Sequence, residues 1–225
     1  MMTENIMKIF RVAFNAALIL CAATGTLIGF IDINSASILS TFTTQSNLFC
    51  VIIAVITVIR IIKGDYSESK TYIFFKGMSL TSILLTFTIY NFFLKPAMKG
   101  TVPEPDALLA FADYLVHVFV PILMLTEYLL FETKGLFKFW YPFVWPSFVI
   151  YYIGYTAVYK LFGGLYVFPG QVLKFPYFFL DYETHGWKNV IMWTSLIIVI
   201  FIVFSFLVFG LDKVLVTIKS KRKTL

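Results

Sequence analysis

The feature that most constrains this chain is a series of apolar segments, each long enough to cross the hydrocarbon core of a membrane, which takes about 20 helical residues. The six predicted segments lie near Val12 to Ile31, Ile38 to Ile59, Gly77 to Leu94, Asp106 to Leu130, Phe139 to Tyr159 and Trp187 to Leu211. Backbone groups in lipid must form hydrogen bonds within their own segment, and no strand-like alternation is visible. We therefore expect an all-α membrane protein, with residues 1–225 forming one six-helix bundle.

Composition excludes several other classes of protein. Of the 225 residues, 60% are apolar and only 13% are charged, whereas charged residues make up about a quarter of a soluble domain. The basic residues stand at the ends of apolar runs and form no dense basic face, so we expect no nucleic-acid partner. The two cysteines, Cys21 and Cys50, both fall inside apolar runs. We predict no disulfide, no metal site and no other cofactor.

The distribution of basic residues predicts the orientation, because positively charged loops stay in the cytoplasm. When the loops are assigned alternately to the two sides, the side with both termini carries Lys8, Arg11, Arg60, Lys63, Lys70, Lys76, Lys134, Lys138, Lys213, Lys219, Lys221, Arg222 and Lys223. The other side carries Lys95, Lys99, Lys160, Lys174 and Lys188. We therefore predict a multi-pass protein of the cell membrane with both termini in the cytoplasm.

The connection between the fifth and sixth segments, residues 160–187, is long and rich in aromatic residues, Gly and Pro. Aromatic side chains at the membrane interface account for this composition. Alternatively, the loop dips inward and covers a cavity. Near its end stand Asp181, Glu183 and His185. An exposed loop histidine usually has no catalytic role, but His185 is an alternative base if the loop folds inward.

The fourth segment holds ionisable residues, which are costly in lipid and usually face the interior of a bundle. Asp113 and His117 are four residues apart on one helix face, so the carboxylate can orient the imidazole. Pro121 has no N–H for the carbonyl of His117, which predicts a kink and a free acceptor. The alternative is that both polar side chains only join helices by hydrogen bonds. Glu127 lies about 5 Å from the cytoplasmic end, and we interpret it as a structural residue that reaches the interface.

The second segment begins with hydroxyl side chains. Thr44 lies about 9 Å into the bilayer, and Asp113 and His117 lie about 10 and 16 Å in from the same side. A hydroxyl, an imidazole and a carboxylate can therefore meet in one half of the membrane. Thr43 remains a competitor for Thr44, because both can lie beside Asn47 on a helix.

These residues resemble a known family. Phe42, Thr44 and Asn47, then His117 with Pro121, then Gly-Leu-Tyr-Val-Phe-Pro at 164–169 resemble the androgen-induced membrane proteins, six-span threonine hydrolases of fatty acid esters of hydroxy fatty acids. The stretches LVHVFVPILMLTEYLLF and FPYFFLD are even more similar to the bacterial Pr-six-Pr membrane proteins, a related group. The resemblance covers most of the chain in the order of its spans.

The resemblance implies that Thr44 is the nucleophile and that His117 is the catalytic histidine. Two departures from the hydrolases are visible. Those enzymes carry an acidic residue where Asn47 stands, and their interval between histidine and proline is one residue longer than that from His117 to Pro121. The resemblance therefore supports the fold more strongly than the chemistry.

Our hypothesis is an intramembrane hydrolase whose substrate is a membrane lipid or lipid ester. Thr44 attacks the ester, His117 transfers the proton, and Asp113 orients the imidazole. Asn47 donates to the oxyanion, and Tyr166 and Phe168 help to bind the substrate. The alternative is a non-catalytic protein that binds or transports a lipid or another apolar solute in the same cavity. The natural substrate and the oligomeric state stay open.

Overall fold

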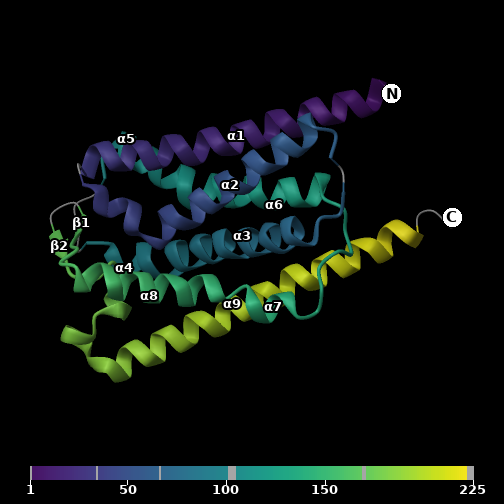
Figure 1. Cartoon of the computed structure of the whole chain (residues 1–225). Coiled ribbons are helices and arrows are strands. Elements are labelled where there is room, and N and C mark those ends of the chain that lie inside the picture. Colours follow the sequence, from purple (N-terminus) through teal and green to yellow (C-terminus); the bar gives the residue numbers. More distant parts are fainter. Residues whose placement is uncertain (1, 34, 66, 101–104, 169–170, 222–225) are drawn as a thin grey trace.

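The computed structural model describes residues 2–33, 35–65, 67–100, 105–168 and 171–221. The helices in these ranges are α1 (Met2–Ile33), α2 (Phe42–Ile62), α3 (Lys70–Ile89), α4 (Lys95–Met98), α5 (Ala107–Tyr114), α6 (Val120–Phe131), α7 (Tyr141–Val144), α8 (Ser147–Leu161) and α9 (Tyr182–Lys221). The long helices lie roughly along one axis, and α1 begins at the end of the bundle where α9 ends (Figure 1). Three residues used in the sequence interpretation, Pro169, Arg222 and Lys223, lie outside the described residues.

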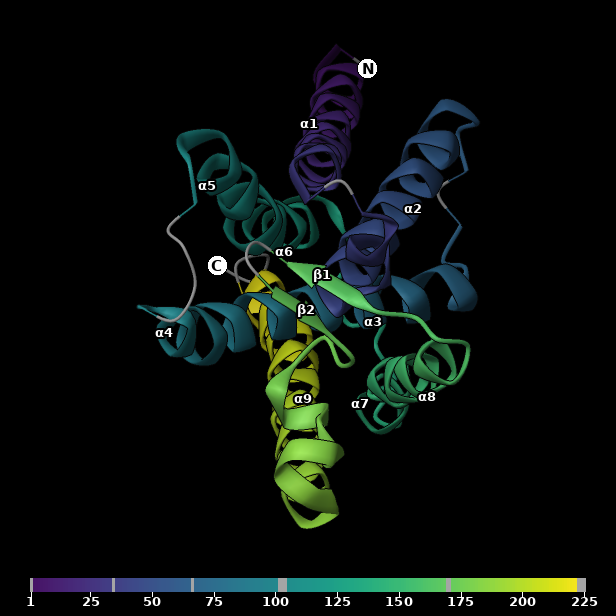
Figure 2. The same ribbon diagram turned by 90° about the vertical axis from the view of Figure 1, so that its left-hand side faces the viewer.

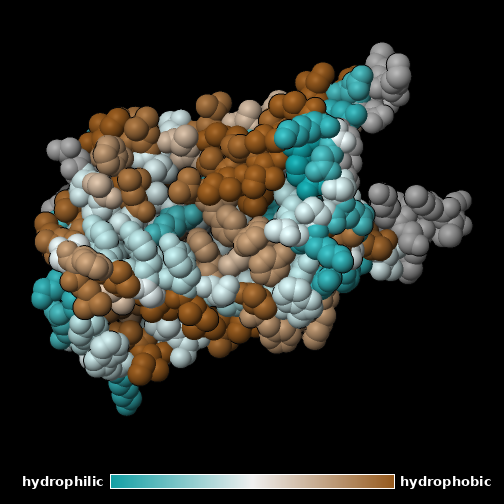
Figure 3. Space-filling model, in the orientation of Figure 1, coloured by the Kyte–Doolittle hydropathy of each residue, from teal (hydrophilic) through white to brown (hydrophobic). Residues whose placement is uncertain are grey.

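Five helical stretches of the described chain are long and apolar enough to cross a membrane. They are Asn5–Asp32, Phe42–Ile62, Lys70–Met98, Ala107–Phe131 and Tyr182–Thr217, and they correspond to five of the six predicted segments. Large apolar side chains along them, such as Leu20 and Leu196, are exposed. Figure 3 shows brown, apolar surface over the middle of one face and hydrophilic residues gathered at the end where α1 begins. The fold is therefore compatible with a multi-pass membrane protein.

The predicted fifth segment consists of two helices, α7 and α8, which are separated at Trp145 and Pro146. Proline has no N–H with which to continue the hydrogen-bond ladder of a helix. Trp145 is fully buried, and its indole N–H donates to the carbonyl of Phe74 in α3 at 3.0 Å. The indole packs on Gly77, where a Cβ would overlap the ring. Trp145, at the break, therefore attaches this segment to α3.

Two π-helical turns face each other in the bundle. The turn η2 (Tyr90–Leu94) follows α3, and the turn η3 (Leu115–Phe119) joins α5 to α6. Each turn ends two residues before a proline, Pro96 or Pro121, which cannot donate to the preceding turn. The His117 carbonyl, the acceptor expected to be free, receives a hydrogen bond from the Asn91 amide at 3.2 Å. Single π turns are frequent at functional sites.

The long loop contains a small antiparallel hairpin, β1 (Tyr166–Phe168) and β2 (Gln171–Leu173). An all-helical prediction misses it because three-residue strands are too short to show alternation. The hairpin lies across one end of the bundle (Figure 2), and the N–H of Val167 donates to the Ser37 hydroxyl at 2.9 Å. After the short helix η4 (Phe178–Leu180), α9 begins with a break at Gly186, whose φ is 74°. The uninterrupted part of α9 therefore begins at Trp187, where the sequence predicted the start of the sixth segment.

Candidate functional site

The side chains of Asp113 and His117 meet, as their spacing on one helix predicts. His117 Nδ1 lies 2.8 Å from Asp113 Oδ1 and 3.1 Å from the Asp113 backbone oxygen. Both partners are acceptors, so Nδ1 carries a hydrogen, and in the neutral tautomer this leaves Nε2 as an acceptor. The imidazole is buried. Asp113 therefore fixes both the orientation and the tautomer of His117.

A threonine hydroxyl faces the free nitrogen of this imidazole. Thr43 Oγ1, in the first turn of α2, lies 3.2 Å from His117 Nε2. The Thr44 hydroxyl instead lies 3.2 Å from the hydroxyl of Thr41, the residue that caps α2. By helical periodicity alone, Thr43 and Thr44 can both lie beside Asn47. The observed distances favour Thr43 as the partner of His117.

Two further residues, from η2 and the start of α4, complete the surroundings of the imidazole. The ring of Tyr90 stacks on His117 with ring centroids 3.4 Å apart and an interplanar angle of 10°. The Tyr90 hydroxyl forms a hydrogen bond with the Asp113 carboxylate, and Lys95 Nζ lies 3.1 Å from Asp113 Oδ2. Sequence reasoning missed both residues because they lie on a different segment from Asp113. The sequence signal that could have pointed to this region is a proline shortly after each π turn, Pro96 after Tyr90 and Pro121 after His117.

The long loop also reaches this point. The Tyr177 hydroxyl accepts a hydrogen bond from the N–H of Phe42 at 3.2 Å and interacts with the hydroxyl and N–H of Thr43. Burial raises the pKa of Tyr177, so its phenol keeps a proton to donate. We call Thr43, Tyr90, Asp113, His117 and Tyr177 the imidazole cluster. The loop therefore supplies a protonated hydroxyl beside Thr43, which sequence reasoning did not identify.

Asn47, the expected oxyanion donor, is occupied elsewhere. Its amide nitrogen donates to the carbonyls of Thr43 at 2.8 Å and Val116 at 3.1 Å. Both amide hydrogens are thus used, and among the described residues Asn47 Oδ1 has no hydrogen-bond partner. In this geometry Asn47 joins α2 to η3 and has no N–H left for a substrate.

The imidazole cluster borders a cavity of about 1380 Å³. Its walls come from α1, α2, α5, the two π turns and the long loop, which therefore folds over the end of the bundle. Phe168 lines this cavity, as does His185. Tyr166 is instead fully buried, with its ring 5.1 Å from that of Tyr159. Of the two aromatic residues predicted to bind substrate, the structure places Phe168 on the wall of the cavity and buries Tyr166 against Tyr159.

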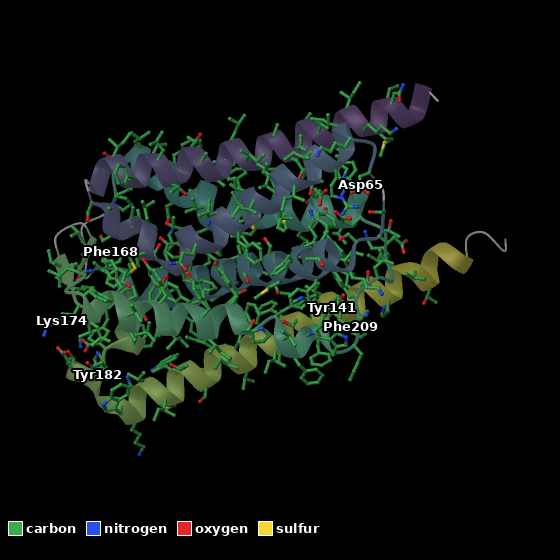
Figure 4. All side chains as sticks on the ribbon, viewed as in Figure 1. Asp65, Tyr141, Phe168, Lys174, Tyr182 and Phe209 are labelled. Carbon is green, nitrogen blue, oxygen red and sulfur yellow. The ribbon has the colours of Figure 1, made fainter. Side chains whose placement is uncertain are left out.

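The other polar residues of the loop mainly hold it in place. Asp181 accepts hydrogen bonds at 3.0 Å from two N–H groups of the first turn of α9. Burial opposes the charged form, but these hydrogen bonds outweigh it and lower the pKa of Asp181. Glu183 pairs with Lys160 and Lys174, at 2.5 and 2.7 Å. Figure 4 shows Phe168, Lys174 and Tyr182 together at this end, opposite the end that holds Asp65.

A second polar cluster joins α1, α3 and α6. Glu127 is fully buried and pairs with Lys76 and with Arg11, the latter at 2.9 Å. Glu132 accepts from Arg11 at 2.5 Å and from the Tyr72 hydroxyl at 2.6 Å. We call these five residues the carboxylate cluster. The expectation that Glu127 reaches the interface is wrong, because cations from α1 and α3 meet it inside the bundle.

Within the described ranges, no group of three or more His, Cys, Asp or Glu side chains is placed to hold a metal ion. Comparisons of the chain with protein-family models, with curated proteins and with solved structures found no match.

Proposed function

We propose that this protein is an intramembrane hydrolase of lipid esters, with Thr43 as nucleophile and His117 as general base. The observation that supports this most strongly is the order of hydroxyl, imidazole and carboxylate, joined by distances of 3.2 and 2.8 Å. All three groups line the large cavity. This arrangement is the one that activates hydroxyl nucleophiles in acyl transfer. The proposal places the nucleophile one residue before the position that the family resemblance implies.

In the first half of the reaction, Thr43 Oγ1 attacks the ester carbonyl carbon and gives its proton to His117 Nε2. The Asp113 carboxylate stabilises the imidazolium that forms. The tetrahedral intermediate then collapses as the bond between carbon and the leaving oxygen breaks. His117 Nε2 donates its proton to that oxygen, so an alcohol leaves and an acyl-threonine remains.

In the second half, water replaces the alcohol. His117 takes a proton from the water, whose oxygen attacks the acyl-threonine carbonyl. When the bond to Thr43 Oγ1 breaks, His117 returns the proton to that oxygen and the free acid leaves. The protein ends in its starting protonation state.

The developing oxyanion needs a hydrogen-bond donor. Because the Asn47 amide is engaged by two carbonyls, we assign this role to the Tyr177 hydroxyl. It lies against Thr43 and accepts from the N–H of Phe42 at the amino end of α2. Accepting from that N–H polarises the phenol and strengthens it as a donor.

We further propose that α7 and α8 together form a sixth crossing and that both termini are cytoplasmic. The basic residues of the sequence support this orientation, which puts the imidazole cluster in the outer half of the membrane. Single cysteines at Lys63 and Lys99 test the proposal in whole cells. An impermeant thiol reagent should label position 99 and not 63, and the reverse pattern would invert the topology.

The hydrolase proposal is tested with protein purified in micelles and given p-nitrophenyl esters with acyl chains of 2 to 12 carbons. Wild-type protein should release both acid and alcohol, and rapid acid quenching should leave an acyl group on the peptide that contains Thr43. Thr43→Ala should abolish turnover, whereas Thr44→Ala, the matched control, should keep most of it. Binding of esters without release of acid would favour the alternative, a protein that binds or transports an apolar solute.

A further inference from the structure

Thr43 stands between two cavities. The large cavity lies on the side of His117. A second cavity, of about 50 Å³, lies between α2, α3, α8, α9 and the long loop. Thr43, Tyr90, Leu94 and Tyr177 line both. An ester carbonyl placed at the Thr43 hydroxyl therefore has room for one substituent on each side.

The two cavities differ in chemical character. The large one includes charged side chains such as Lys95, Lys174 and Asp106 at its wall. The wall of the small one is overwhelmingly apolar, with Leu85, Ile89, Val149, Ile153 and Ile197 among its lining residues. Val149 and Leu85 are themselves buried. The small cavity therefore suits a hydrocarbon group better than a charged one.

The position of His117 decides which part of an ester occupies which cavity. Among the described residues, His117 and Asp113 line the large cavity and do not line the small one. His117 Nε2 must reach the leaving oxygen in order to protonate it. The alcohol part of the ester therefore lies in the large cavity, and the acyl chain points past Thr43 into the small one.

We propose that the small cavity is the acyl pocket and that the substrate is an ester of a short acyl group with a larger alcohol. This inference rests on the proposed hydrolase function. A cavity of about 150 Å³ holds the six carbons of benzene, or about 25 Å³ per carbon. By that scale, a cavity of about 50 Å³ holds about two carbons beyond the carbonyl.

The experiment measures kcat/KM for p-nitrophenyl acetate, butyrate, octanoate and dodecanoate in one detergent, with the rate of Thr43→Ala subtracted. For wild-type protein we expect the highest values for acetate or butyrate and a fall of at least about tenfold to dodecanoate. Val149→Ala enlarges the pocket and should raise the octanoate value relative to acetate by about tenfold. Val149→Phe fills the pocket and should lower the butyrate value relative to acetate. Leu109→Ala changes the wall of the large cavity alone, so its chain-length profile should match that of wild type.

The outcomes separate this inference from the function on which it rests. Thr43-dependent hydrolysis that rises with chain length to dodecanoate would overturn the acyl pocket while the hydrolase stands. The same conclusion follows if neither substitution of Val149 changes the profile. If no ester shows Thr43-dependent hydrolysis, the proposed function itself fails, and the acyl pocket fails with it.

Discussion

The imidazole cluster and the carboxylate cluster contain similar groups in opposite surroundings. Each has a carboxylate, a nitrogen partner and a tyrosine hydroxyl. In the carboxylate cluster, Glu127 and Lys76 are almost completely buried, and Arg11 and Lys76 balance Glu127 and Glu132. The imidazole cluster borders a large cavity, toward which Thr43 and His117 face.

We interpret this difference as a division of the polar groups inside the bundle into those that hold helices together and those that can act on a ligand. Charges that are buried and fully paired are costly to separate, because removing one leaves its partner in a medium of low dielectric constant. Groups that are oriented but face a cavity keep hydrogen-bonding capacity for a ligand. We therefore expect the carboxylate cluster to control stability and the imidazole cluster to control turnover.

The largest expected effect is on stability, in the carboxylate cluster. Lys76→Met should lower the free energy of unfolding by about 3–5 kcal/mol, because it leaves Glu127 buried with one cation fewer. The double variant Lys76→Met/Glu127→Leu should recover most of the loss. Unfolding of the purified protein in detergent measures both. His117→Ala is the control from the other cluster and should be nearly as stable as wild type. Equal losses for Lys76→Met and His117→Ala would remove the distinction between the clusters.

The next effect is on turnover, in the imidazole cluster. Asp113→Asn keeps the size of the side chain but removes the charge that stabilises the imidazolium, so kcat should fall about 10- to 10³-fold with KM retained. In the background of His117→Ala, the same substitution should have little further effect on the residual rate, since no imidazole remains to be oriented. Additive losses in the double-mutant cycle would mean that Asp113 acts independently of His117.

A smaller effect is expected at Tyr177. Tyr177→Phe removes the hydroxyl beside Thr43 but keeps the ring, so kcat should fall about 10- to 10²-fold with little change in KM. Tyr155→Phe is the matched control. The Tyr155 hydroxyl forms a hydrogen bond with the Ser40 hydroxyl at 2.8 Å, and Tyr155 is not among the described residues that line the large cavity. A loss that appears in KM alone, or equally in both variants, would assign Tyr177 to packing and not to the oxyanion.

The smallest effect concerns the loop that covers the cavity. Asp181→Ala removes the cap of α9 and should cost about 1 kcal/mol of stability at neutral pH. The folded state lowers the pKa of Asp181, so its contribution is present above the ordinary carboxyl pKa and is lost as the pH falls through the lowered value. Between about pH 7 and pH 3, the free energies of unfolding of wild type and Asp181→Ala should converge at the acid end. A constant difference across that range would show that the charge plays no part.

The sequence alone was sufficient where an inference depended on one segment. Lengths of apolar runs located the five long helices, because a span needs about 20 residues and lipid tolerates little else. The four-residue spacing of Asp113 and His117 predicted their contact, since helical periodicity fixes which side chains share a face. Pro121 likewise indicated that the His117 carbonyl receives no hydrogen bond from position 121, and the Asn91 amide donates to it instead. These conclusions use geometry that is the same in every α-helix.

Tertiary structure alone decided the contacts between segments. It placed the hydroxyl of Thr43 against His117, directed the Asn47 amide to two carbonyls, brought Tyr177 from the loop to α2 and paired Glu127 with Lys76. Each of these depends on the rotation of one helix or loop against another, which is set by the packing of many side chains at once. No local period in the sequence encodes that rotation, so the sequence determined the helices and the Asp113–His117 pair, and the packing determined the geometry of the candidate site.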